Sequence, residues 1–143
     1  MSEQKIDHNG PAVRRFLESM PIFALFGAKV VNFAAGQSEL EMPWRHDLTF
    51  YGIAIPATVT GALLDFAGGS AAATLLPVGW GIMTTGFEVH NTARAAGERL
   101  VALGTAIHMG KSTGLARADV FVERDGQRTL SASGLVTVRA LPV

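Results

Sequence analysis

One acidic residue, Asp65, lies inside a long apolar segment and is the first candidate for chemistry in this sequence. Its neighbours are Leu64 and Phe66, and a buried carboxylate without partners costs enough free energy that proteins rarely keep one without a use. A carboxylate can attack a carbonyl carbon as a nucleophile, or it can take a proton from water as a general base. The residues leave open which role applies. They equally allow a structural role, in which Asp65 accepts hydrogen bonds from a backbone turn or from a hydroxyl group of a second subunit.

The start of the same segment offers hydrogen-bond donors for a developing negative charge. Pro56 suits the first position of a helix, and Ala57 and Thr58 would then present N–H groups where the helix dipole favours negative charge. Asp65 is eight residues beyond Ala57, about 12 Å along one helix, which is too far for one carbonyl group to contact both. If both serve one site, two subunits must pair about a two-fold axis with antiparallel helices. The alternative is an ordinary helix start with a hydroxyl group near solvent.

Other side chains in the sequence could position a ligand. Hydroxyl groups that could orient water or substrate belong to Thr60, Ser112 and Thr113, although such residues are more often turn or capping groups. Aromatic side chains that could form the wall of a pocket belong to Phe50, Tyr51 and Trp80, and less clearly to Trp44 and Phe87, although aromatic residues more often belong to the core.

Nucleotide hydrolysis and metal binding are not supported by the motifs. The segment Gly110-Lys111-Ser112 resembles the end of a phosphate-binding loop, but five residues instead of four separate Gly110 from Gly104, and a strand is expected to follow. The histidines at positions 46, 90 and 108 show no pairwise spacing suited to one metal ion, so no metal is expected.

The composition describes one compact soluble domain. The chain has 143 residues, 48% of them hydrophobic and none of them cysteine, which excludes disulfides and cysteine–zinc sites. Twelve basic and twelve acidic residues give a net charge of +0, so nucleic acid is not an expected partner. The N-terminus lacks the apolar stretch of a secretory signal, and the apolar region 53–83 contains Asp65 and two prolines. We therefore expect a cytoplasmic protein without a membrane span.

The hydrophobic periodicity predicts an α+β fold with one long helix. Val13, Phe16, Leu17 and Met20 recur at helical spacing, which predicts a short helix over 11–20 that Pro21 ends. The long helix is expected over 56–75, and the alternating segments predict strands over 29–33, 38–42, 82–90, 99–109, 115–124 and 129–139. Asp125-Gly126 is a strong signal for a two-residue hairpin between the last two strands. Consecutive strands of this kind form an antiparallel sheet that wraps against one helix.

Three segments, together with this order of elements, resemble the hotdog superfamily, and more narrowly the thioesterases of the phenylacetate-degradation type. The segments are 46–52 before the long helix, 62–68 within it, and 90–97 after the third strand. None is specific alone, and the resemblance covers about residues 24–139. It implies a hotdog fold, in which a curved antiparallel sheet of about six strands wraps one central helix. Residues 1–143 would form a single domain, with 1–20 as an N-terminal tail and short helix.

The resemblance also implies a site and an assembly. Asp65 would be the catalytic residue, and substrate and oxyanion would contact Ala57, Thr58, Tyr51 and Gly52. The turn at Lys111 and Ser112, and also Arg94, would lie near the nucleotide end of coenzyme A, although both cations could equally be solvated loop charges. Homodimers would hold sites at their interface, with a dimer of dimers expected, and no cofactor would be needed beyond the coenzyme A of the substrate.

One motif departs from the family pattern. Family members usually begin the central helix with His-Gly-Gly, nine residues from the histidine to the acid, and this chain has Pro56-Ala57-Thr58 there. The leading hypothesis is an acyl-CoA thioesterase that acts on a small aromatic or short-to-medium acyl group. The alternative is a non-catalytic acyl-CoA or aromatic-ligand binding protein. An enoyl-thioester hydratase or dehydratase ranks last, because the central helix has no histidine.

Overall fold

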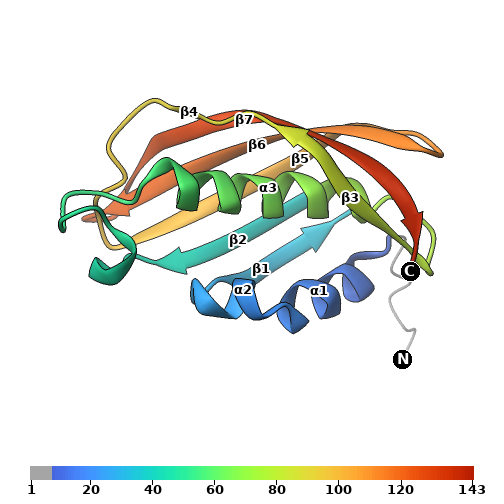
Figure 1. The fold of residues 1–143 in the computed structure, drawn as a ribbon, viewed down its shortest axis with the longest axis horizontal. Helices are drawn as coiled ribbons and strands as arrows, with labels where there is room; N and C mark the ends of the chain where they lie inside the picture. Colours follow the sequence, from blue (N-terminus) through green and yellow to red (C-terminus); the bar gives the residue numbers. More distant parts are fainter. Residues whose placement is uncertain (1–7) are drawn as a thin grey trace.

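The computed structural model describes residues 8–143 and has the predicted α+β architecture (Figure 1). The helices are α1 (Gly10–Ser19), α2 (Pro21–Leu25), the 3-10 helix η1 (His46–Leu48) and α3 (Ala57–Ala73). The strands are β1 (Lys29–Ala34), β2 (Gln37–Pro43), β3 (Trp80–Phe87), β4 (His90–Asn91), β5 (Arg99–Met109), β6 (Thr113–Arg124) and β7 (Gln127–Pro142). None of these helices has both the length and the hydrophobicity that crossing a membrane requires.

The strands form one antiparallel sheet that curls around α3, which confirms the hotdog fold (Figure 1). Their order is β1-β2-β5-β6-β7-β3, and β4 pairs with β7 beside the end of β3. The single strand predicted over 82–90 is interrupted at residues 88 and 89. Phe87 pairs with Val136 and His90 with Ser133, so β4 continues β3 in the same register after the break.

The central helix packs closely against the concave face of the sheet because small residues line the contact. Its sequence has no internal proline, and Pro56 immediately precedes its first turn. A Cβ atom added at Gly68 would lie 2.6 Å from Val136 Cγ2, and one added at Gly104 of β5 would collide with the backbone carbonyl of Ala67. The Ser38 hydroxyl also donates to the Ala67 carbonyl oxygen at 2.6 Å. Glycine is therefore required where helix and sheet meet.

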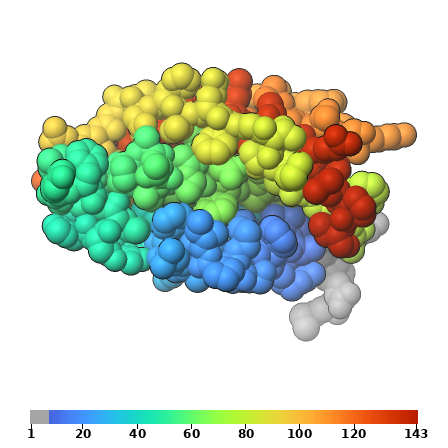
Figure 2. Space-filling view, viewed as in Figure 1, coloured from blue at the N-terminus to red at the C-terminus, as the bar shows by residue number. Residues whose placement is uncertain are grey.

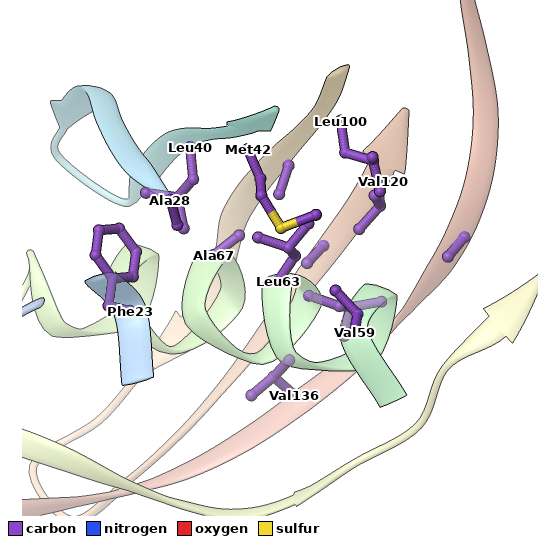
Figure 3. Close-up of a cluster of buried hydrophobic side chains, with 14 of the residues drawn as sticks. Phe23, Ala28, Leu40, Met42, Val59, Leu63, Ala67, Leu100, Val120 and Val136 are labelled. Carbon is purple, nitrogen blue, oxygen red and sulfur yellow. The ribbon is translucent and has the colours of Figure 1, made fainter. Parts of the chain in front are cut away.

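The core fills the space between α3 and the sheet (Figure 3). Leu63 and Ala67 of the helix are fully buried against Leu40, Met42 and Leu100 of the strands. Strand β6 has the alternation from which it was predicted, since every second residue from Ala116 to Val122 is buried. The strands thus turn one face to the helix and the other outward.

Two local predictions have different outcomes. The turn Asp125-Gly126 connects β6 and β7 with φ values of 52° and 75°, as a two-residue hairpin of this sequence type requires. At the N-terminal end, Pro21 was expected only to end the first helix. It instead also begins α2, because proline fits the first position of a helix as well as the position after one. Residues Val13 and Leu17 of α1 are buried.

Candidate active site

Asp65 lies on α3 and faces the neighbouring strand β3. The Thr84 hydroxyl donates a hydrogen bond of 2.7 Å to Asp65 Oδ1. The side chain is half-buried, and no described residue donates to the second carboxylate oxygen, Oδ2. One oxygen is thus held by the protein, and the other is left for a ligand or for water.

The electrostatic setting of Asp65 favours its neutral form. Burial raises the pKa of the Asp65 carboxyl above its ordinary value, and the hydrogen bond from Thr84 offsets part of that rise. A carboxylate with a raised pKa is a stronger base than an ordinary one, which suits proton transfer near neutral pH. Asp65 therefore holds its proton more tightly than an exposed aspartate does, and its Oδ2 has no hydrogen-bond donor among the described residues.

Asp65 borders an apolar groove of about 330 Å³ between α1, α3 and β3. Figure 2 shows α1, in blue, beside α3, in green, on this side of the molecule. Helix α1 and the residues that flank it contribute Asn9, Ala12, Val13, Phe16, Leu17 and Met20 to the lining. Helix α3 contributes Asp65, Phe66, Gly69, Ser70 and Ala73. The other lining residues are Gly79, Trp80, Gly81, Ile82, Thr84 and Val143. Among these described residues, Asp65 has the one ionisable side chain. A carboxyl group at the side of an apolar groove can act on a ligand that has an apolar tail.

The start of α3 presents the predicted donors, but away from Asp65 of the same chain. Ala57 and Thr58 are exposed. The first N–H groups of α3 with an acceptor in the chain are those of Val59 and Thr60, which both donate to the Pro56 carbonyl oxygen. The N–H groups of Ala57 and Thr58 therefore lack intrahelical acceptors. Neither residue lines the groove. One subunit alone does not bring the donors and the carboxylate together.

The hydroxyl group of Thr60 has a structural partner. Thr60 is fully buried, and its Oγ1 lies 3.0 Å from Asn91 Oδ1 and 3.4 Å from the Ala57 carbonyl oxygen. This contact ties β4 to the first turn of α3. A role in orienting water or substrate at Asp65, which the sequence had suggested, has no support from this position.

The loop before α3 lies apart from the groove. Tyr51 is 95% exposed and has a φ of 55°, while Gly52 has a φ of 71° and donates its N–H to Thr49 Oγ1. Phe50 is also exposed. Phe50 and Tyr51, which were predicted as possible walls of an acyl pocket, do not line the groove of their own chain. Trp80 was predicted in the same way and does line it.

The predicted coenzyme A residues are exposed but lie far apart in one chain. Arg94 precedes β5, whereas Lys111 and Ser112 follow it, in the turn to β6. Strand β5 has 11 residues, so about 35 Å separates its ends. The Ser112 carbonyl oxygen accepts the N–H of Ala140, which fixes the turn beside β7. In residues 8–143, no histidine, aspartate and glutamate side chains gather into a group that could hold a metal ion.

Sequence reasoning missed two residues of the site. Thr84, which holds Asp65, lies in a strand where alternation gave no sign of a functional partner. Asn9 lines the groove, where its N–H donates to the Thr74 carbonyl oxygen at 2.8 Å and its Nδ2 donates to the Trp80 carbonyl oxygen at 3.3 Å. Among the described residues, Asn9 Oδ1 is the buried side-chain oxygen without a hydrogen-bond partner. The polar helix start gave no signal for this role.

Sequence comparison alone gives no match to this chain. No protein-family model matches it, and no curated protein does. Solved structures do match. A thioesterase family protein from Silicibacter pomeroyi is 30% identical, with a TM-score of 0.88, and the match covers 92% of this chain and 96% of that chain.

Two more distant structures share the fold. A thioesterase from Haemophilus influenzae has a TM-score of 0.81 at 16% identity, over 99% of this chain and 93% of that chain. The PaaI protein from the phenylacetic acid degradation operon of E. coli has a TM-score of 0.79 at 16% identity, over 89% of this chain and 88% of that chain. At these identities the likeness concerns the fold. The match at 30% identity shows the family: this chain belongs to the hotdog-fold thioesterase superfamily.

Proposed function

We propose that this protein hydrolyses the thioester bond of an acyl-CoA, with a small aromatic or a short-to-medium acyl group, to a free acid and coenzyme A. Asp65 carries the proposal. It is the ionisable side chain of an apolar groove, its pKa is raised by burial, and Thr84 occupies one of its oxygens. A carboxylate in this setting suits attack on a carbonyl carbon, or activation of water for that attack.

The reaction would proceed through a tetrahedral intermediate by either route. With Asp65 as the general base, Oδ2 takes a proton from water, the water oxygen bonds to the carbonyl carbon, and the carbon–sulfur bond then breaks. The departing thiolate takes the proton back from Asp65. With Asp65 as the nucleophile, the carboxylate bonds to the carbonyl carbon and displaces the thiolate, and water then hydrolyses the anhydride. No cofactor enters either route.

The oxyanion would be bound across a homodimer. The distance along α3 separates Asp65 from the donors of its own chain, so the partner subunit's Ala57 and the partner subunit's Thr58 are proposed to face it, with the two helices antiparallel. Strand β3 supports such pairing. It is the end strand of the sheet, and it exposes Met83 and Phe87, at 50% and 48%. Dimers could pair further into tetramers.

The remaining predicted residues fit the same arrangement. Tyr51 and Gly52 lie in the loop that leads into α3, so they would contact the substrate together with the oxyanion donors. Arg94, Lys111 and Ser112 are exposed, and their charges and hydroxyl group suit the phosphates of coenzyme A. Two-fold pairing would bring opposite ends of the two sheets near each other, so that one coenzyme A could meet residues of both subunits.

The test is release of free thiol from a panel of acyl-CoAs, from acetyl to decanoyl with benzoyl and phenylacetyl members. Asp65→Asn is expected to lower kcat at least a hundredfold, since loss of a general base typically costs about 10²–10⁴. Asp119→Asn is the matched control, because Asp119 also accepts a short hydrogen bond, of 2.6 Å from Ser133, outside the groove. Wild-type rates in Asp65→Asn would remove Asp65 from the mechanism.

A non-catalytic ligand-binding protein is the second candidate, and the helix start favours it. Pro56-Ala57-Thr58 replaces the usual His-Gly-Gly, so the imidazole is absent and Ala57 adds a Cβ atom beside the expected oxyanion position. Acyl-CoA binding without thiol release across the whole panel would support this function over hydrolysis.

A further inference from the structure

The groove extends in one direction from Asp65, toward the C-terminal end of α3. Asp65, Gly69 and Ala73 line it from the helix, and their spacing of four residues places them on one face. From Asp65 to Ala73 this face is about 12 Å long. Gly69 has no side chain and Ala73 has only a methyl group, so neither fills the groove, and Ile82 Cδ1 of β3 lies close to Gly69.

The residues of β3 that line the groove extend over about the same length as those of α3. Thr84 lies at Asp65, and a Cβ atom added at Gly69 would lie 3.1 Å from Ile82 Cδ1. Trp80 lies two residues before Ile82 in the same strand, so Thr84 and Trp80 are about 13 Å apart. The two walls therefore run side by side from the carboxylate to Trp80.

The start of α1 contributes Asn9 to the far end of the lining. The hydrogen bonds of Asn9 to the carbonyl oxygens of Thr74 and Trp80 join α1 to the end of α3 and to the start of β3. Phe16 of α1 and Met20, which follows α1, continue the apolar wall. The lining of the groove thus extends from the carboxylate of Asp65 to Asn9 and Trp80.

We infer that the groove measures the acyl chain and selects linear acyl groups of about eight to ten carbons over single-ring aromatic groups. An extended chain covers about 3.3–3.6 Å per three bonds, so a 12 Å groove accepts about ten bonds. A phenylacetyl group reaches only about half this distance and leaves the part between Gly69 and Trp80 unfilled. The inference rests on the proposed function, because it assigns the substrate class of that site.

Chain length should therefore control the specificity constant up to a limit. Each methylene group buried in the groove is expected to raise kcat/KM about fourfold. The gain should stop near ten carbons, when the chain reaches Asn9 and Trp80. Octanoyl- and decanoyl-CoA should then exceed butyryl- and phenylacetyl-CoA by at least tenfold.

Two matched substitutions should shorten the longest acyl chain that the groove accepts, by different amounts. Gly69→Val adds volume one helical turn from Asp65, and Ala73→Val adds volume two turns away. Gly69→Val should restrict turnover to chains of about four to six carbons, and Ala73→Val to chains of about eight. Ala24→Val on α2, which is exposed and outside the groove, should leave the length profile unchanged. Circular dichroism and thermal unfolding verify that each variant is folded.

A binding measurement separates this inference from the proposed reaction. Trp44 and Trp80 are the tryptophans of the chain, so Trp44→Phe leaves Trp80 as the fluorescent reporter of the groove. Free fatty acids of four to fourteen carbons are titrated against this variant, with and without each valine substitution. Binding that peaks at eight to ten carbons and shifts in the expected order supports the inference, even if no thioester is hydrolysed and the proposed function fails.

The opposite results are equally clear. Thioester hydrolysis with no dependence on chain length, or with phenylacetyl-CoA equal to octanoyl-CoA, would overturn the inference and leave the proposed function standing. A length profile that neither valine variant changes would also overturn it, because the chain would then lie elsewhere.

Discussion

The two halves of the proposed site lie on one helix, and this gives a sharp test by subunit complementation. Asp65→Asn removes the carboxylate, and Ala57→Pro removes one N–H group at the other end of α3. Proline is well tolerated at a first helical position, and Pro56, with a ψ of 164°, already has the extended conformation that a following proline requires. Each variant should therefore fold while it lacks one reacting group.

The expected magnitudes follow from the 12 Å separation along the helix. Loss of one oxyanion donor typically costs about 10²–10³ in kcat, and loss of a general base about 10²–10⁴, so each parent should retain about 1% or less. When the two are mixed in equal amounts and allowed to exchange subunits, about half of the dimers are mixed. Each mixed dimer holds one intact site and one doubly altered site, which restores about 25% of wild-type activity.

The assay is thiol release after joint unfolding and refolding of the two variants. Mixing Asp65→Asn with Asp65→Ala is the negative control and should restore nothing. Ala57→Gly, which keeps the N–H group and removes only Cβ, should stay within about tenfold of wild type, since no donor is lost. Activity of the mixture that equals the average of its parents would refute the shared site, because the two groups would then act within one subunit or not together.

Further predictions concern pH and packing. Because kcat/KM requires ionised Asp65, it should rise with pH through the raised pKa of that group, and Thr84→Val should move the midpoint higher, as it removes the hydrogen bond that lowers the pKa. The folded state holds the Asp65 proton more tightly than the unfolded chain does. Protonation of Asp65 therefore stabilises the fold at acid pH, and this contribution to stability is lost as the pH rises through the raised pKa. Asp65→Asn should thus raise the Tm at neutral pH and not at acid pH, in thermal melts at both. Gly104→Ala should destabilise the fold by about 3 kcal/mol in urea titrations, because its Cβ collides with the Ala67 carbonyl, whereas Gly126→Ala on the surface should cost about 1 kcal/mol.

The sequence predicts those parts of the fold whose pattern is local. The alternation in β6 and the sequence Asp125-Gly126 determine a strand and its turn without reference to distant residues. Asp65 could be identified for the same reason, because a single charged residue within an apolar helical segment is visible in the local sequence. The sequence placed the helix start at Pro56, one residue before the observed first residue, Ala57.

The groove could not be predicted in this way, because its walls come from three separate segments. Thr84 reaches Asp65 from 19 residues away and Asn9 reaches Trp80 from 71 residues away. Between Thr84 and Gly86 the pairing of β3 with β7 shifts by one residue, and such a bulge changes which side chains face the helix. Tyr51 adopts a positive φ in an exposed loop and does not line the groove of its own chain, and its residue type does not predict this conformation.

The altered helix start changes the site less than its sequence suggests. The family pattern has glycines where this chain has Ala57 and Thr58, yet both residues lie at the beginning of a regular α-helix. In a helix the direction of each N–H group is set by the helical backbone, and the first of these groups have no intrahelical acceptors whatever their side chains. The substitution therefore keeps the donors and adds bulk beside them. Only the imidazole at position 56 is lost, so the proposed mechanism assigns proton transfer to Asp65, with Thr84 as its hydrogen-bond partner.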